Sequence, residues 1–143
     1  MPAAATASKA RAKAPAAKAA AKPAVQLIEI PHLDKGEIWI GGIILPDRTT
    51  RHTILLPGEH KGLDFDKAQE YCKKLGGSAP ERIEQGLAFK FHQKEFRPVA
   101  YWSCEQSAIR SSWAWGQHFC DGSQTSGTKS LKLAVRAVRR VVI

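Results

Sequence analysis

Cys104 and His118 are the two side chains whose types could support covalent catalysis. A cysteine becomes a nucleophile when a neighbouring histidine takes its proton, and both residues lie in stretches that we expect to form adjacent strands. However, no third residue that would orient the histidine stands out, and Cys104 follows Trp102 and Ser103 in a stretch typical of a core strand. We therefore expect no catalytic residues, and a hydrolase or oxidase using Cys104 ranks last among the functions considered.

Metal binding is also not indicated by the sequence. The three cysteines form no CxxC pair, and the five histidines do not cluster near them, so the spacing does not fit a zinc site. Calcium requires about six to eight oxygen ligands. Near the Trp102 stretch only Glu105 is acidic, and Asp121 beyond it is expected in a turn. We expect no metal and no other cofactor.

The cysteines leave two interpretations open. Cys104 and Cys120 could form a disulfide across neighbouring strands, which would require an oxidising compartment. The simpler interpretation is that Cys72, Cys104 and Cys120 are three small buried side chains in a reducing compartment.

Two polar stretches, residues 105–112 and 121–130, are expected to be long loops, and binding residues concentrate on loops. Trp102 and Trp115 are expected in the core, whereas Trp113 directly follows the first loop and should be the most exposed of the three. Solvated loops without a ligand are the alternative. The candidate ligand-binding residues are Glu105, Gln106, Arg110, Ser111, Ser112, Trp113, Gln124 and Thr125.

Residues 1–24 differ sharply in composition from the rest of the chain. They contain thirteen alanines, four lysines and one arginine but no acidic residue, and they carry +5 of the formal net charge of +9. Such a stretch buries too little apolar surface to order itself, so we expect a flexible basic arm. Its regular lysines argue against a secretory signal, and no stretch is long enough to span a membrane. The candidate anchoring residues are Lys9, Arg11, Lys13, Lys18 and Lys22.

The elements that must position these residues begin with a hairpin. Residues 25–35 are expected to form a linker or an edge strand, because Pro31 limits their apolar run. Residues 36–45 and 52–56 are rich in strand formers and flank a turn-rich stretch, which predicts two paired strands. Gly41-Gly42 indicates a bulge in the first of them.

Two helices are predicted next. The first begins after Asp64, a natural N-cap, and ends at Gly76-Gly77. The second begins after Pro80 and ends before Pro98. One face of the first helix should be apolar through Phe65, Ala68, Cys72 and Leu75, and one face of the second through Ile83, Leu87, Ala88 and Phe91.

The last third is predicted to be strands. Residues 99–104 and 113–120 are rich in strand formers, and alternation returns from Leu131 to Ala137 before a break at Val138. Because strands and helices are segregated along the chain, residues 36–143 are expected to form one α+β domain with an antiparallel sheet.

Several segments together resemble a known domain. They are WIGGI (39–43), DFDKAQEYCKKLGGSAPERIEQ (64–85), YWSCEQ (101–106), AWGQHFCDGSQ (114–124) and AVRAVRR (134–140). The sequence resembles a bacterial and phage-associated domain of unknown function, found at the C-terminus of lectin-like adhesins within the C-type-lectin-like superfamily. The resemblance implies a C-type-lectin-like fold with two helices flanking a twisted antiparallel sheet. It also implies that Arg136, Arg139 and Arg140 form structural ion pairs; a phosphate-contacting patch is the alternative.

The function expected from these features is non-enzymatic. The chain would be a structural or binding component of a phage particle or prophage-encoded assembly, made in the bacterial cytoplasm and located in the virion. Its arm would attach it to other subunits, and we expect a homo-oligomer without membrane contact. The alternative is a nucleic-acid-associated protein, with the basic arm on DNA or RNA and the domain as a partner-binding head.

Overall fold

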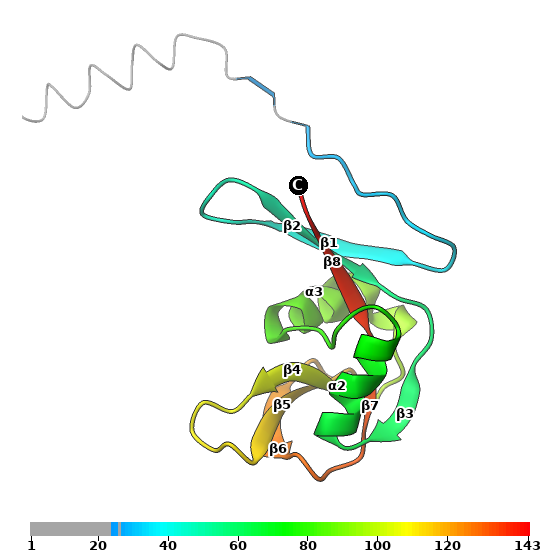
Figure 1. Ribbon diagram of the computed structural model, residues 1–143, viewed down its shortest axis with the longest axis vertical. Coiled ribbons are helices and arrows are strands. Elements are labelled where there is room, and N and C mark those ends of the chain that lie inside the picture. The colour runs from blue at the N-terminus through cyan, green and yellow to red at the C-terminus, as the bar shows by residue number, and fades with distance from the viewer. Residues whose placement is uncertain (1–23, 26) are drawn as a thin grey trace, which may run out of the picture.

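The computed structural model describes residues 24–25 and 27–143 (Figure 1). The five candidate anchoring residues of the arm, Lys9, Arg11, Lys13, Lys18 and Lys22, lie outside the described residues. Residues 27–35 approach the first strand without joining either sheet, so the part of the predicted linker or edge strand that is described contains no strand.

The described residues form an α+β structure, as the segregation of the elements predicts. The order along the chain is β1 (Ile38–Ile44), β2 (Thr50–Leu55), β3 (His60–Leu63), α2 (Phe65–Lys74), α3 (Arg82–His92), a short 3-10 helix η1 (Gln93–Glu95), β4 (Ala100–Gln106), β5 (Trp113–His118), β6 (Gln124–Thr128), β7 (Leu133–Val135) and β8 (Val138–Val142).

The strands form two sheets, not the single antiparallel sheet that was predicted. One sheet has the order β1-β2-β8 and the other β3-β7-β4-β5-β6. The pairs are antiparallel except for β4 and β7, which run parallel and meet at Tyr101 and Ala134. The two sheets lie at opposite ends of the molecule, with α3 between them (Figure 1). The chain changes sheet between β7 and β8, which is where the break at Val138 was predicted.

The three-stranded sheet contains the predicted hairpin. β1 and β2 pair antiparallel, and their register shifts between Trp39 and Gly41, which confirms the expected bulge. β8 then pairs along the other side of β2. The final strand of the chain thus completes the sheet that the first hairpin begins.

Helix α2 has the N-cap, the C-terminal glycine and most of the buried face that the sequence predicts. The Asp64 carboxylate accepts a 2.9 Å hydrogen bond from the Lys67 backbone N–H, and Gly76 has a φ of 82° in the left-handed region. Phe65, Ala68 and Cys72 are buried as predicted. Leu75 was wrongly placed in the buried stripe: the helix ends at Lys74, the chain turns away, and Leu75 is 44% exposed.

The buried face of α3 differs from the predicted one. Ile83 and Phe91 are exposed, so the stripe expected through them is wrong. Of that stripe only Ala88 is buried, and it is joined by Glu84 and Gln85. These polar side chains are buried because strands distant in the sequence supply their partners: the Gln85 amide nitrogen donates to the backbone carbonyls of Tyr101 and Trp102.

The Glu84 carboxylate lies at the centre of a buried network. Arg140 of β8 donates to both of its oxygens at 2.8 and 2.7 Å, and the Thr53 hydroxyl of β2 donates at 2.6 Å. The Glu84 side chain is fully buried. Burial alone would raise the pKa of Glu84, but the hydrogen bonds from Arg140 and Thr53 and the Arg140 charge outweigh it and hold the pKa below its usual value. The network fastens α3 to two strands of the small sheet.

Of the other two arginines of the closing motif, Arg139 forms an ion pair as expected, whereas Arg136 bonds to backbone carbonyls within the described residues and not to a carboxylate. Arg139 forms two 2.8 Å bonds to the Glu37 carboxylate, which lower the pKa of Glu37 to about 2. Arg136 donates to the backbone carbonyls of Leu56, Gly58 and Glu95. The phosphate-patch alternative for these arginines is therefore disfavoured, because their donors are already engaged.

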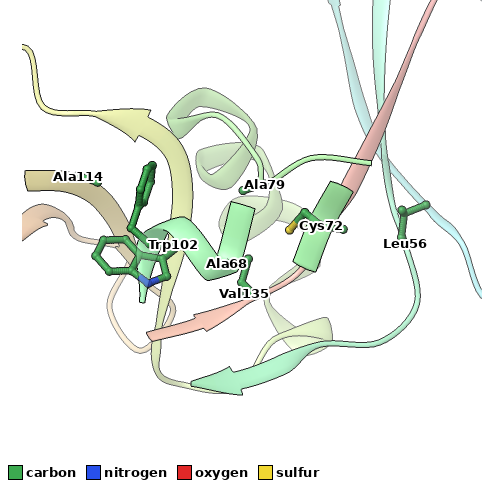
Figure 2. Packing of buried hydrophobic residues seen from close by; sticks show 9 residues of the cluster. Leu56, Ala68, Cys72, Ala79, Trp102, Ala114 and Val135 are labelled. Atoms are coloured by element: carbon green, nitrogen blue, oxygen red, sulfur yellow. The ribbon is translucent and has the colours of Figure 1, made fainter. Parts of the chain in front are cut away.

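The main apolar core lies between α2 and the five-stranded sheet. Ala68 and Cys72 of α2, Trp102 of β4 and Val135 of β7 belong to one buried cluster (Figure 2). The Trp102 indole N–H donates to the Leu63 carbonyl at 2.8 Å, so this large ring is buried with its polar atom satisfied. Trp102 therefore occupies the core position that its sequence context predicts.

Replacing Glu84 should test the buried network. Glu84→Gln leaves Arg140 with an uncompensated charge, and we expect a loss of about 3 to 5 kcal/mol in the free energy of unfolding, measured with urea. The matched control is Glu81→Gln, at the N-cap of the same helix. Glu81 pairs with Arg51 but its side chain is 34% exposed, so the loss should stay below about 1 kcal/mol. Equal losses in the two variants would contradict a dominant role for the buried pair.

Candidate ligand-binding face

One face of the five-stranded sheet carries two tryptophans side by side. Trp113 and Trp115 lie two residues apart on β5, so their side chains share a face. β6 pairs with β5 in full register, with Trp115 opposite Ser126. β6 corrects a prediction, because residues 121–130 were expected to be a loop. Its backbone groups are paired by the ladder to β5, and the side chains of Gln124, Thr125 and Thr128 each have a hydrogen-bond partner.

An arginine covers each tryptophan. The Arg82 guanidinium, from the first residue of α3, lies 3.5 Å from the centre of the Trp115 ring. The Arg110 guanidinium lies 4.7 Å from the centre of the Trp113 ring. Both distances are within the range of cation–π attraction. We call Arg82, Arg110, Trp113 and Trp115 the Arg–Trp face.

The Arg82 side chain is held in place from two sides. Its Nε donates to the Gln124 amide oxygen at 3.1 Å, and the Gln124 amide nitrogen donates back to the Arg82 carbonyl at 2.7 Å. Gln124 also donates to the Gln117 amide oxygen at 2.8 Å. The Glu105 carboxylate accepts the Arg82 backbone N–H at 2.7 Å, which caps the start of α3 from a different strand.

An open depression of about 570 Å³ lies beside this arrangement. Its walls combine the start of α3 with the end of β4 and the start of β6. It presents carboxylates, one guanidinium and one apolar side chain. The lining residues are Glu81, Arg82, Ile83, Cys104, Glu105 and Gln124.

Arg110 and Trp113, the second half of the face, are positioned by the loop between β4 and β5. The Ser107 hydroxyl accepts the backbone N–H groups of Ile109 and Arg110, and the Ser107 N–H donates to the Trp113 carbonyl. These bonds close a tight loop in which Ile109 is 92% exposed. Lys129 supports its base by donating to the Gln106 amide oxygen at 2.5 Å.

The chemistry of the Arg–Trp face suits an acidic group. Stacking on Trp115 and the bond to Gln124 fix the plane of the Arg82 guanidinium, and within the described residues its two terminal nitrogens have no hydrogen-bond partner. A fixed guanidinium with free terminal donors matches a carboxylate or phosphate in a bidentate arrangement. The carboxylates of Glu81 and Glu105 on the rim would restrict which anions approach.

The structure brings together only part of the predicted ligand-binding set. Glu105 and Gln124 meet at the depression, and Arg110 with Trp113 forms the neighbouring half of the face. Ser111 and Ser112 are exposed in the loop between β4 and β5. Gln106 and Thr125 are exposed and bonded to Lys129 and His118.

Arg82 was missed by the sequence analysis, although one signal was present. A positive charge in the first turn of a helix opposes the helix dipole, and Arg82 is the first residue of α3. Trp115 was expected in the core; it is only half buried, because the Arg82 guanidinium covers it where an apolar side chain would be expected.

The Cys104–His118 pair is not assembled. Cys104 lines the depression, whereas His118 lines a separate groove of about 110 Å³ and lies 3.2 Å from the Thr125 hydroxyl. Burial raises the pKa of the Cys104 thiol; the Arg140 charge opposes the rise and nearby carboxylates add to it. A raised pKa leaves little thiolate for nucleophilic attack.

The cysteines are three free thiols in different surroundings. Cys72 is fully buried, Cys104 is half buried and Cys120 is exposed, so the expectation of three buried cysteines holds only for Cys72. The Cys104–Cys120 disulfide does not form in this structure.

Residues 24–25 and 27–143 bring no three His, Cys, Asp or Glu side chains together as a metal-binding group. No helix in that part of the chain is long and apolar enough to cross a membrane. A scan against known protein families finds no match to the sequence, and a search of curated proteins finds none either.

Thiol alkylation should distinguish the three cysteines under native conditions. We expect Cys120 to react first because it is exposed, and Cys104 to react slowly because its pKa is raised. Cys72 should be protected until the protein unfolds, since burial and the neighbouring Cys104 raise its pKa to about 12. Peptide mass spectrometry over time measures the order. Preferential modification of Cys104 would contradict this assignment and revive its candidacy as a nucleophile.

Proposed function

We propose that this chain is a non-enzymatic structural and binding component of a phage particle or prophage-encoded assembly. Its folded part is a C-type-lectin-like domain that presents the Arg–Trp face to a ligand carrying an acidic group. Residues 1–24 form the basic arm that attaches the domain to other subunits of the virion.

The fold assignment within this proposal is supported by where the resembling segments lie. The segment 64–85 contributes α2 and the start of α3, and the segment 134–140 contributes the crossing from β7 to β8. Arg136, Arg139 and Arg140 are all used for internal bonds. Three arginines used for internal bonds suit a structural scaffold, and such scaffolds carry many different functions.

The observation that carries the binding function is the fixed position of Arg82. A long cationic side chain at a surface normally samples many rotamers, and ordering it on binding costs free energy. Here Trp115 and Gln124 already hold it beside an open depression. An arginine fixed in this way is better suited to recognising a partner than to keeping the surface soluble, for which no fixed position is needed.

The arm supplies charge and reach to the proposed attachment. Fully extended, a stretch of 24 residues spans up to about 80 Å. Its five positive charges and absence of acids suit a negatively charged partner. An acidic protein surface in the particle is the partner that we propose, and nucleic acid is the second candidate because the same charges would neutralise phosphates.

The ligand-binding part of the proposal can be tested with particles that carry variants. Arg82→Met keeps apolar contact with Trp115 but removes the donors, and we expect adsorption of the particles to host cells to weaken about tenfold or more. Lys90→Met is the matched control, since Lys90 is an exposed cation on the same helix outside the depression. Unchanged adsorption for Arg82→Met would remove the Arg–Trp face as the binding site.

The attachment part can be tested by shortening the chain. A form that starts at Val25 should keep its thermal stability, because the core clusters of the described residues begin at Ile38, but should no longer co-sediment with particles. Changing Lys9, Arg11, Lys13, Lys18 and Lys22 to Ser at constant length should weaken attachment as well. A shortened form that assembles normally would refute the anchoring role.

Salt dependence separates the two candidate partners of the arm. If the arm binds nucleic acid, retention of the full chain on DNA or RNA should fall steeply between about 50 and 200 mM salt, with a slope that reflects about five phosphate contacts. If it binds a protein surface, particle attachment should depend less on salt, and replacing its alanines with bulky residues should weaken attachment more.

A further inference from the structure

Exposed apolar side chains gather at the end of the molecule away from the Arg–Trp face. They lie on the segment before β1 and at the free ends of β1 and β8, beside the small sheet (Figure 1). Each is between 53% and 86% exposed, although isolated surface hydrophobics rather than groups are the norm. These residues are Val25, Leu27, Ile28, Ile30, Ile44, Val142 and Ile143.

The segment and the small sheet enclose a groove. A hollow of about 270 Å³ has Leu27, Ile28 and Glu29 on one side and the ends of β2 and β8 on the other. A second hollow of about 250 Å³ adjoins it, lined by Ile28, Ile44, Arg48 and Thr50. The groove therefore has apolar walls and carries one acidic and one basic side chain at its mouth. We call it the N-terminal groove.

A buried donor at this groove lacks a partner. His52 lines the groove, and its side chain is fully buried. The Trp39 indole N–H donates to His52 Nδ1 at 3.0 Å, so the proton of the neutral ring is on Nε2. Nε2 is buried and has no hydrogen-bond partner among the described residues. A buried donor without a partner is unusual, because buried polar groups are nearly always paired.

Arg48 adds a second, independent sign. It lies in the turn between β1 and β2 with a φ of 71°, a left-handed conformation that costs free energy in a residue with a Cβ atom. This conformation closes the hairpin loop, in which the Arg48 N–H donates to the Leu45 carbonyl at 2.8 Å. The Arg48 guanidinium stands at the mouth of the groove, and no acidic side chain within the described part of the chain pairs with it.

We propose that a second copy of this chain covers the N-terminal groove and forms a two-fold symmetric dimer. In a two-fold contact, the same patch is used on both copies. Residues Ile28, Ile44 and Ile143 of one copy pack against those of the other. Glu29 of each copy then pairs with Arg48 of the partner, so the two opposite charges of the patch are satisfied across the axis.

The composition of residues 1–23 makes them a poor occupant. Apart from Met1, their apolar side chains are alanine and proline, which cannot fill a groove lined by leucine and isoleucine. Their positive charges would also be repelled by the Arg48 guanidinium. A second copy brings large apolar side chains, and its Glu29 carboxylate can face Arg48.

The first test is the mass of the full chain in solution, measured by sedimentation across micromolar concentrations. We expect a dimer, and we expect Ile44→Lys combined with Ile143→Lys to be monomeric with its thermal unfolding retained, since both side chains are exposed. Ile109→Lys is the control: this residue is even more exposed but lies on the β4–β5 loop, and its dimer should persist. A full chain that is monomeric throughout, or a dimer that survives the double substitution, overturns the proposal.

The second test exploits the two-fold symmetry. Glu29→Arg alone places two arginines opposite each other at both contacts, and Arg48→Glu alone places two carboxylates there, so each variant should be monomeric. A mixture of the two restores an opposite-charge pair at both contacts and should form the mixed dimer. A mixture that stays monomeric overturns the pairing across the axis. Both tests are independent of the ligand and of particle attachment, so their failure leaves the proposed function unaffected.

Discussion

The buried carboxylate of Glu84 is the constraint on which the arrangement of this molecule depends. The carboxylate accepts hydrogen bonds from Arg140 of β8 and from the Thr53 hydroxyl of β2. The next residue of the same helix, Gln85, bonds to β4 of the other sheet. A charge removed from water is stable only when its partners are held in place. The position of α3 relative to both sheets is therefore fixed, and Arg82, two residues earlier, is brought against Trp115.

This dependence explains which parts of the structure follow from the sequence. Helix α2 was predicted well because its cap, stripe and C-terminal glycine are all local signals. The face of α3 was not, because Glu84 finds Arg140 at a distance of 56 residues and no local pattern carries that information. The apolar periodicity of Ile83 and Phe91 pointed to the wrong face, since a carboxylate and an amide took the buried positions.

The candidate site divides in the same way. Glu105 and Gln124 were found because polar residues near expected loops are good candidates, yet β6 was missed since its sequence, QTSGT, has no apolar alternation. The strand exists because β5 offers a complete ladder to it. The contact of Arg82 with Trp115 could not be found without knowing that α3 begins over β5. Site residues that come together only through sheet pairing and helix docking have no regular spacing in the sequence, so the sequence alone does not predict them.

The order of the strands has a consequence for how the protein is made. β7 lies second in the larger sheet, between β3 and β4, and β8 forms one edge of the smaller, although these two strands come after all the others in the chain. While the chain is being synthesised, both sheets remain open and Glu84 lacks Arg140 until the last strands leave the ribosome. Such late, long-range closure slows folding and leaves strand edges exposed in the meantime. The domain can therefore close only after β7 and β8 have been made, and a nascent chain stalled before β7 would be a target for chaperones.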